Sequence, residues 1–166
     1  MIIFRYKEES LGGRGTIQRP VADVSLKTKN NSWIEFHPYI DSGADVIMVP
    51  LSLGKLLGFE IDEGKIQQIG GIRGSVPVIY AKTGMRIGKE EFLVRVAWAL
   101  IEDVPPLLGR TDVFDIFKVT FEQNKKIITF EKTYSTNLKF YLARSFLNGN
   151  ILIRIIAGRL NSVPHP

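Results

Sequence analysis

The stretch Ile40-Asp41-Ser42-Gly43-Ala44-Asp45 decides how this sequence is interpreted. It ends an apolar run over residues 33–40 and precedes a short segment with helical spacing. An ionised carboxylate at the end of a buried strand is costly unless it is paired or hydrogen-bonded. Small residues after it let the backbone approach closely and donate N–H groups. Asp41 is therefore a candidate catalytic carboxylate, although Asp-Ser-Gly is also common turn chemistry.

Two glycine-containing motifs follow along the chain. Ile69-Gly70-Gly71-Ile72-Arg73-Gly74 lies between two extended arms, residues 65–69 and 75–80, which predicts a β-hairpin with a glycine-rich tip. Leu107-Leu108-Gly109-Arg110 follows the strand breaker Pro105-Pro106 and precedes a predicted helix over residues 111–117. A phosphate cradle at the first motif is disfavoured, because the chain lacks Gly-Lys-Ser/Thr and a dinucleotide fingerprint opens a helix.

These motifs, in this order, resemble those of retropepsins, the retroviral-type aspartic proteases. The resemblance covers residues 18–131. It implies that Asp41 is catalytic, that Ser42 bonds across a dimer, and that residues 69–74 form the tip of a mobile flap. It also implies a pairing of Arg110 with Asp45. The remaining residues of the active-site loop and of its structural support are Gly43, Ala44, Leu107, Leu108 and Gly109.

The resemblance also implies the assembly and the reaction. The chain has one Asp-Ser-Gly element, whereas aspartic proteolysis needs two carboxylates, so a two-fold axis has to bring together two copies of Asp41. Two close carboxylates share one proton, an effect for which aspartic proteases are the standard example. The expected activity is that of an aspartic endopeptidase, which acts as a homodimer on a peptide or protein substrate and needs no cofactor.

Hydrophobic patterning predicts the rest of the fold. Strands are expected over residues 21–26, 33–40 and 91–101, the last buried on both faces, and a hairpin over 118–122 and 127–131. A short helix is expected over residues 49–59, with Pro50 in its first turn and Gly58 at its end. The expected fold is mostly β: a retropepsin-like closed barrel of the single-lobe acid-protease type, with short helices and a C-terminal extension.

The chain divides into three expected regions. Residues 1–17 form a lead-in whose Gly12-Gly13-Arg14-Gly15 is flexible or turn-forming, and residues 18–131 form the protease-like domain. Residues 132–166 form an apolar and basic extension, which Asn148-Gly149-Asn150 splits into either a helix or a hairpin. Its apolar face has no obvious mate in the core, so we expect it to take part in forming the dimer.

Composition excludes several function classes. The 166 residues include no cysteine, which rules out disulfides and thiolate chemistry. The net charge is +5, but residues 131–166 hold five basic residues and one acidic residue, which leaves +1 for the other 130 residues. We therefore expect no nucleic-acid partner. No segment has the length of a membrane span or signal peptide, so we expect no membrane partner and a cytoplasmic location.

Other chemistries have fewer supporting residues. The chain has two histidines, His37 and His165, and neither has the neighbours that a metal site or a serine triad requires. The main alternative is a non-catalytic module that uses the same fold to dimerise or to bind peptides, with Asp41 in a supporting role. A basic nucleic-acid binder is a third hypothesis, which rests on the net charge alone.

Overall fold

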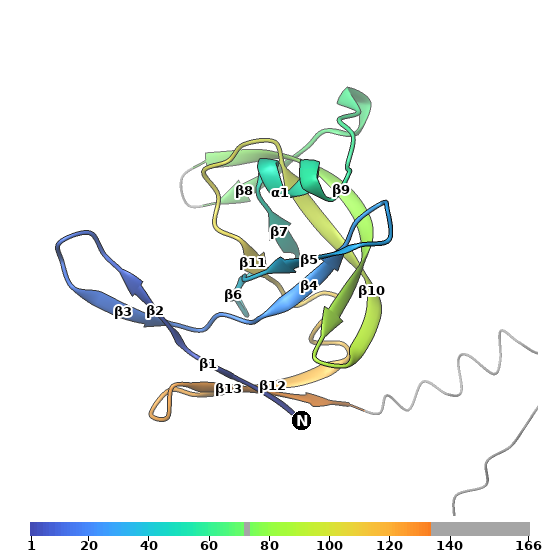
Figure 1. Cartoon of the computed structure of the whole chain (residues 1–166). Helices are drawn as coiled ribbons and strands as arrows, with labels where there is room; N and C mark the ends of the chain where they lie inside the picture. Colours follow the sequence, from blue (N-terminus) through green and yellow to red (C-terminus); the bar gives the residue numbers. More distant parts are fainter. Residues whose placement is uncertain (72–73, 134–166) are drawn as a thin grey trace, which may run out of the picture. The chain divides into compact units, whose positions relative to one another are not determined.

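The computed structural model describes residues 1–71 and 74–133, and it confirms the predicted mostly β fold (Figure 1). The helical segments are α1 (Leu51–Leu56) and the 3₁₀ turn η1 (Glu63–Lys65). The strands are β1 (Ile2–Arg5), β2 (Lys7–Ser10), β3 (Thr16–Arg19), β4 (Val24–Lys27), β5 (Trp33–Phe36), β6 (Tyr39–Ile40), β7 (Ile47–Val49), β8 (Gln67–Gly71), β9 (Gly74–Ile87), β10 (Glu90–Ala99), β11 (Leu107–Leu108), β12 (Phe117–Glu122) and β13 (Ile127–Lys132).

The main sheet has eight strands in the order β5-β4-β9-β10-β7-β11-β6, with β8 paired to β9. It curls until the residues before β4 meet its far edge, where Val21 bridges Tyr39. Two further hydrogen bonds hold this meeting point: Ala22 N–H donates to the Pro38 carbonyl (3.1 Å), and Ile40 N–H donates to the Pro20 carbonyl (2.8 Å). The expected barrel-like form therefore arises from one strongly curled sheet.

A second sheet has the order β1-β13-β12, and aromatic side chains join it to the main sheet. Phe92 of β10 packs against Phe117, whose ring lies 5.7 Å from that of Phe130. Phe130 in turn meets Phe4 of β1 edge-to-face at 5.4 Å. Phe117 and Phe130 are almost fully buried, so this row of rings forms a continuous core between the two sheets.

The predicted short helix is confirmed as α1, and a buried tryptophan fixes its position. Trp98 Nε1–H donates to the Leu51 carbonyl at 3.1 Å. A Cβ atom at Gly54 would lie 2.1 Å from that same nitrogen, so only glycine lets the helix approach the indole this closely. Gly58 follows the helix with φ +85°, a left-handed conformation that glycine adopts without strain.

The predicted helix over residues 111–117 is wrong. The segment makes two successive turns, with Phe114 N–H donating to the Arg110 carbonyl and Phe117 N–H to the Val113 carbonyl. Asp112 between them has φ 69°, which breaks a right-handed helix. Its carboxylate accepts a hydrogen bond from Arg95 N–H at 2.8 Å, so a side-chain contact with β10 replaces helical continuity.

Two predicted strands differ in detail. The run 33–40 is split between β5 and β6 at Pro38, which lacks a backbone donor, and the chain there changes its pairing partner from β4 to β11. The run 91–101 is covered on both faces over Val96–Ala99, but Leu93 is 76% exposed and Ile101 is 39% exposed. The two predicted hairpins are both present, as β8–β9 and β12–β13.

The region expected as a lead-in contains three strands. Residues 12–15 do make a turn, but β2 and β3 pair on either side of it, and β1 pairs antiparallel with β13. Met1–Thr133 form one compact unit, so these strands belong to the same body as the barrel. Among the described residues, no helix has the length and apolar character needed to cross a membrane. The C-terminal extension beyond residue 133 lies outside the described residues.

The pairing of β1 with β13 predicts a position-specific stability effect. Phe4 is 9% exposed, and Phe4→Ala should lower the free energy of unfolding by about 3 kcal/mol through the lost burial and the cavity left behind. Ile3 lies on the opposite face of the same strand and is 52% exposed, so Ile3→Ala serves as the matched control. Urea unfolding of both variants should separate them, and equal effects would contradict the placement of β1.

Candidate active site

The candidate active-site loop lies in the connection between β6 and β7. These consecutive strands do not pair with each other, because β11 lies between them, parallel to β6 and antiparallel to β7. The connection, residues 41–46, must therefore pass over the end of β11. This topology brings together two motifs that are far apart in the sequence, residues 41–45 and 107–110.

Three backbone hydrogen bonds join the first motif to residues 108–111. Asp41 N–H donates to the Leu108 carbonyl at 3.1 Å. Arg110 N–H donates to the Ala44 carbonyl, and Thr111 N–H donates to the Asp45 carbonyl, each at 2.9 Å. Because each motif both donates and accepts, neither can shift without leaving backbone groups unpaired.

Gly109 is the closest point of contact between the motifs. A Cβ atom built on it would lie 2.3 Å from the Val46 carbonyl oxygen and 2.7 Å from the Val46 nitrogen. Both neighbours are backbone atoms, so the clash could not be relieved by a side-chain rotation. The glycine is thus required by packing.

The Asp41 carboxylate sits on a tight turn and is partly exposed. Its Oδ1 accepts a hydrogen bond from Gly43 N–H at 2.8 Å, and Ala44 N–H donates to the Asp41 carbonyl at 3.2 Å. Ser42 and Gly43 are exposed at the tip of this turn. Within the described residues no second carboxylate is hydrogen-bonded to Asp41.

Asp45 and Arg110 form an ion pair through Oδ1 and Nη2. The pair is mostly exposed, with 77% of the Asp45 side chain and 54% of the Arg110 side chain accessible. Exposed ion pairs contribute little to stability, typically about 0.2–1 kcal/mol. Its effect is therefore to orient the last residue of the loop, while the backbone contacts fix where the loop lies.

An open hollow of about 360 Å³ adjoins Asp41. Its walls include Tyr39 and Arg19, two residues that sequence analysis did not single out. The Tyr39 hydroxyl donates to a Glu9 oxygen at 2.7 Å, and this hydrogen bond raises the pKa of Tyr39. Arg19 Nε is buried and makes no hydrogen bond among the described residues, although it lies 3.4 Å from the same Glu9 oxygen.

A signal for Tyr39 was present in the sequence. Alternate residues of an extended chain point to the same side, so Tyr39, two positions before Asp41, shares its face. Arg19 and Glu9 had no such signal, because their contact with this region depends on pairing between Val21 and Tyr39.

The predicted flap is a hairpin that extends from the main sheet. Ile69 and Gly70 lie in β8, Gly71 ends it, and Gly74 begins β9 with φ 120°. Ile72 and Arg73 lie outside the described residues. No hydrogen bond or ion pair joins the described residues of the hairpin tip to the Asp41 loop, so its function as a flap stays a prediction.

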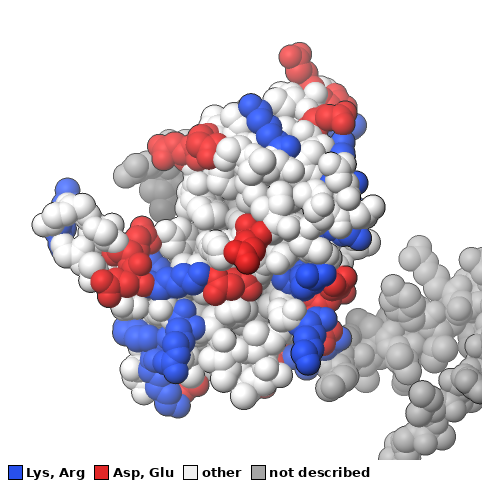
Figure 2. Space-filling model, in the orientation of Figure 1, with Lys and Arg blue, Asp and Glu red and all other residues white. Residues whose placement is uncertain are grey.

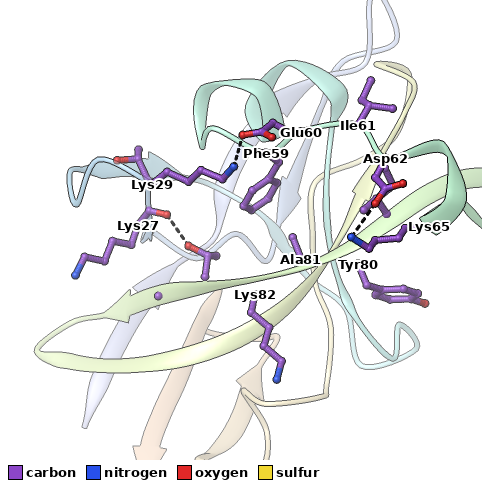
Figure 3. A pocket seen from close by; sticks show the side chains of 14 residues that line it. Lys27, Lys29, Phe59, Glu60, Ile61, Asp62, Lys65, Tyr80, Ala81 and Lys82 are labelled. Carbon is purple, nitrogen blue, oxygen red and sulfur yellow. Dashed lines mark hydrogen bonds and ion pairs between the residues drawn. The ribbon is translucent and has the colours of Figure 1, made fainter.

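A larger hollow of about 560 Å³ lies elsewhere, between the end of β4, the segment after α1 and β9 (Figure 3). Its rim holds two ion pairs, Lys29–Glu60 at 2.6 Å and Lys65–Asp62 at 2.8 Å, and each lysine lowers the pKa of its partner. Within each pair the positive and negative charges cancel. No residue of the candidate loop lines the hollow. We therefore place the candidate site at Asp41, which carries the candidate catalytic carboxylate, and not at the larger hollow.

Charge is distributed unevenly over the face drawn in Figure 2. Lysine and arginine side chains gather over the β12–β13 turn, and acidic side chains gather at the root of β2 and β3. Among residues 1–71 and 74–133, no three His, Cys, Asp or Glu side chains are grouped so as to hold a metal ion.

The fold is similar to that of solved aspartic proteases. A retropepsin-like aspartic protease from Rickettsia conorii matches with a TM-score of 0.53 and 16% sequence identity, over 77% of this chain and 98% of that one. EIAV protease complexed with the inhibitor HBY-793 matches with a TM-score of 0.47 and 22% identity, over 58% of this chain and 86% of that one. No family model and no curated protein matches the sequence. The first likeness establishes a retropepsin-like fold.

The close approach at Gly109 generates a testable expectation. Gly109→Ala should displace the Val46 backbone, lower the free energy of unfolding by about 2–3 kcal/mol, and speed hydrogen exchange at the amides of Asp41 and Arg110. Gly70→Ala is the control, since a Cβ atom there has no neighbour within 4 Å. Unchanged exchange at both amides in the Gly109 variant would show that this contact does not hold the loop.

Proposed function

We propose that this protein is an aspartic endopeptidase that hydrolyses peptide bonds as a homodimer, with one Asp41 from each copy. The observation that carries the proposal is the Asp41 turn, fixed by backbone contacts to residues 108–110 within a retropepsin-like fold. A fold alone does not specify an activity. The proposed activity therefore depends on this carboxylate and on the backbone contacts that hold its turn.

The proposed chemistry requires a second carboxylate close to the first. When two carboxylates lie about 3 Å apart, both cannot ionise, so the pair holds one proton between them. The ionised member acts as the general base for a water molecule, which attacks the peptide carbonyl carbon. The protonated member polarises the carbonyl oxygen and later assists departure of the amine. The pair titrates as a unit, and no covalent acyl-enzyme forms.

The geometry of the single chain supports a partner at this place. The Asp41 carboxylate has one hydrogen bond among the described residues, and Ser42 and Gly43 beside it are exposed. A second copy related by a two-fold axis supplies the same turn in the opposite sense. In this assembly Ser42 bonds across the axis, the small Gly43 permits close approach, and the β8–β9 hairpin closes over bound peptide and excludes water.

The first test is removal of the carboxylate. Asp41→Asn keeps the size of the side chain, and it should reduce cleavage of an unstructured protein to the background of a no-enzyme blank, as measured by mass-spectrometric mapping of products. Asp62→Asn is a matched control, because Asp62 is an exposed carboxylate that lines the larger hollow and does not line the Asp41 hollow. Cleavage by Asp41→Asn at the wild-type rate would refute the catalytic role.

The second test asks whether both copies contribute. If half of the wild-type protein is replaced by Asp41→Asn at constant total concentration, random pairing leaves about one quarter of the dimers with two carboxylates. Activity should then fall to about one quarter after subunit exchange, whereas independent chains would retain about one half. A value at one half would rule out a shared site. Wild-type protein that dimerises and binds peptide without cleaving it would support the non-catalytic module.

A further inference from the structure

The hairpin formed by β2 and β3 protrudes from the body of the molecule, on the side where β6 lies (Figure 1). Among residues 1–71 and 74–133 it forms a sheet of its own, in which each strand pairs only with the other. An isolated two-stranded hairpin is at best marginally stable in water, and unpaired strand edges are templates for association. The hairpin therefore needs support beyond its own ladder.

The two faces of this hairpin differ in character. Residues that pair directly across the ladder share a face, and Leu11 extends the row because its N–H donates to the Gly15 carbonyl at 2.9 Å. Leu11 and Ile17 lie on one face and are 41% and 37% exposed. The other face is polar and contains Glu8, Ser10, Thr16 and Gln18. The hairpin is thus amphipathic, and its apolar side is not fully covered.

The apolar face is continuous with the Asp41 hollow. Glu9 pairs with Ile17 and Lys7 pairs with Arg19, so the same face holds Glu9 and Arg19 at its root. Arg19 lines the hollow beside Asp41, and Glu9 accepts the hydrogen bond from Tyr39. Figure 2 shows basic atoms among uncharged ones at the tip of the hairpin, whose turn contains Arg14, while acidic side chains gather at its root.

A second set of contacts fixes the direction of the root. Lys7 forms an ion pair with Asp23, whose carboxylate also contacts His37 Nδ1 at 2.7 Å. Partial burial raises the pKa of Asp23, but the hydrogen bonds from Lys7 and His37 outweigh this effect and lower the pKa overall. The root is therefore held to the strands that lead into the catalytic loop, and the tip projects beyond them.

We propose that the β2–β3 hairpin is an intersubunit arm whose Leu11 and Ile17 pack against the second copy of this chain. The inference rests on the proposed homodimer. With the two Asp41 carboxylates about 3 Å apart, the partner lies beside the hollow that Arg19 of the hairpin root lines. Each strand of four residues extends about 13 Å farther, which is enough to lie along the partner's surface. The arm then gains the cover that its apolar face lacks.

The test measures dimerisation directly and does not depend on cleavage. Leu11→Lys/Ile17→Lys keeps the hairpin in place, because the lysine introduced at position 17 lies opposite Glu9 on the same face and forms a favourable cross-strand pair. Sedimentation equilibrium of the full chain should show a dimer dissociation constant at least about 30-fold higher than that of wild type, since two arms lose their apolar contacts. Leu93→Lys is the control: Leu93 is 76% exposed on β10, and its dissociation constant should change less than about 2-fold.

A labelling experiment checks the same contact without adding charge. The chain has no cysteine, so Ile17→Cys and Leu93→Cys each introduce a single thiol. Raising the protein concentration through the dimer dissociation constant should slow maleimide labelling at position 17 at least about 10-fold, while labelling at position 93 should not change, because only the first becomes buried.

The outcomes separate the arm from the catalytic proposal. If the lysine variant dimerises like wild type and the position-17 thiol stays equally reactive, the arm is refuted while the shared active site stands. If the variant raises KM with an unchanged dissociation constant, the hairpin contacts substrate and not the partner, which also overturns the arm. If the lysine variant loses cleavage activity at low protein concentration and regains it at high protein concentration, both proposals are supported. Wild-type protein that stays monomeric overturns both.

Discussion

The approach of Gly109 to the backbone of Val46 is the constraint on which the site depends. With 2.3 Å between a hypothetical Cβ and the Val46 oxygen, no other residue fits without moving the chain. This contact allows residues 41–46 to cross directly over the end of β11, and the crossing aligns Asp41 with Leu108 and Arg110 with Ala44. The loop is therefore positioned by backbone atoms. The exposed Asp45–Arg110 pair adds orientation and little free energy.

A second dependence links the loop to the curl of the sheet. Pro38 ends the pairing of β5 with β4 and frees the chain to pair with β11, which places the loop after β6 at the far edge of the sheet. The same edge then meets residues 20–22 through the Val21–Tyr39 bridge. Arg19, which precedes this bridge, is brought beside Asp41 for that reason. The strand that enters the loop is rigid and polar, and such a strand looks unfavourable in isolation. Here it turns the sheet back on itself.

Local signals allowed much of this to be predicted from the sequence. The two hairpins and α1 are each specified by a few neighbouring residues, such as Pro50 and Gly58 at the two ends of the helix. The roles of residues 41–45 and 107–110 were implied by the resemblance to retropepsins, and they stay predictions. The failures depend on distant partners. Asp112 combines a left-handed conformation with a hydrogen bond from Arg95 N–H to its carboxylate, and Phe4 of β1 packs on the distant Phe130. Glu9 reaches Tyr39 only once the sheet has curled, so no sequence window contains that contact.

The single chain presents an incomplete site. A single chain offers one carboxylate, held open on a turn whose tip is exposed, and none of the other described residues completes it. Arg19, which lines the hollow beside the carboxylate, comes from the root of a hairpin whose Leu11 and Ile17 are exposed and whose outer edges pair with no other described strand. In the proposed homodimer one partner completes both features, because a two-fold axis beside Asp41 would cover the hairpin in the same step that it supplies the second carboxylate.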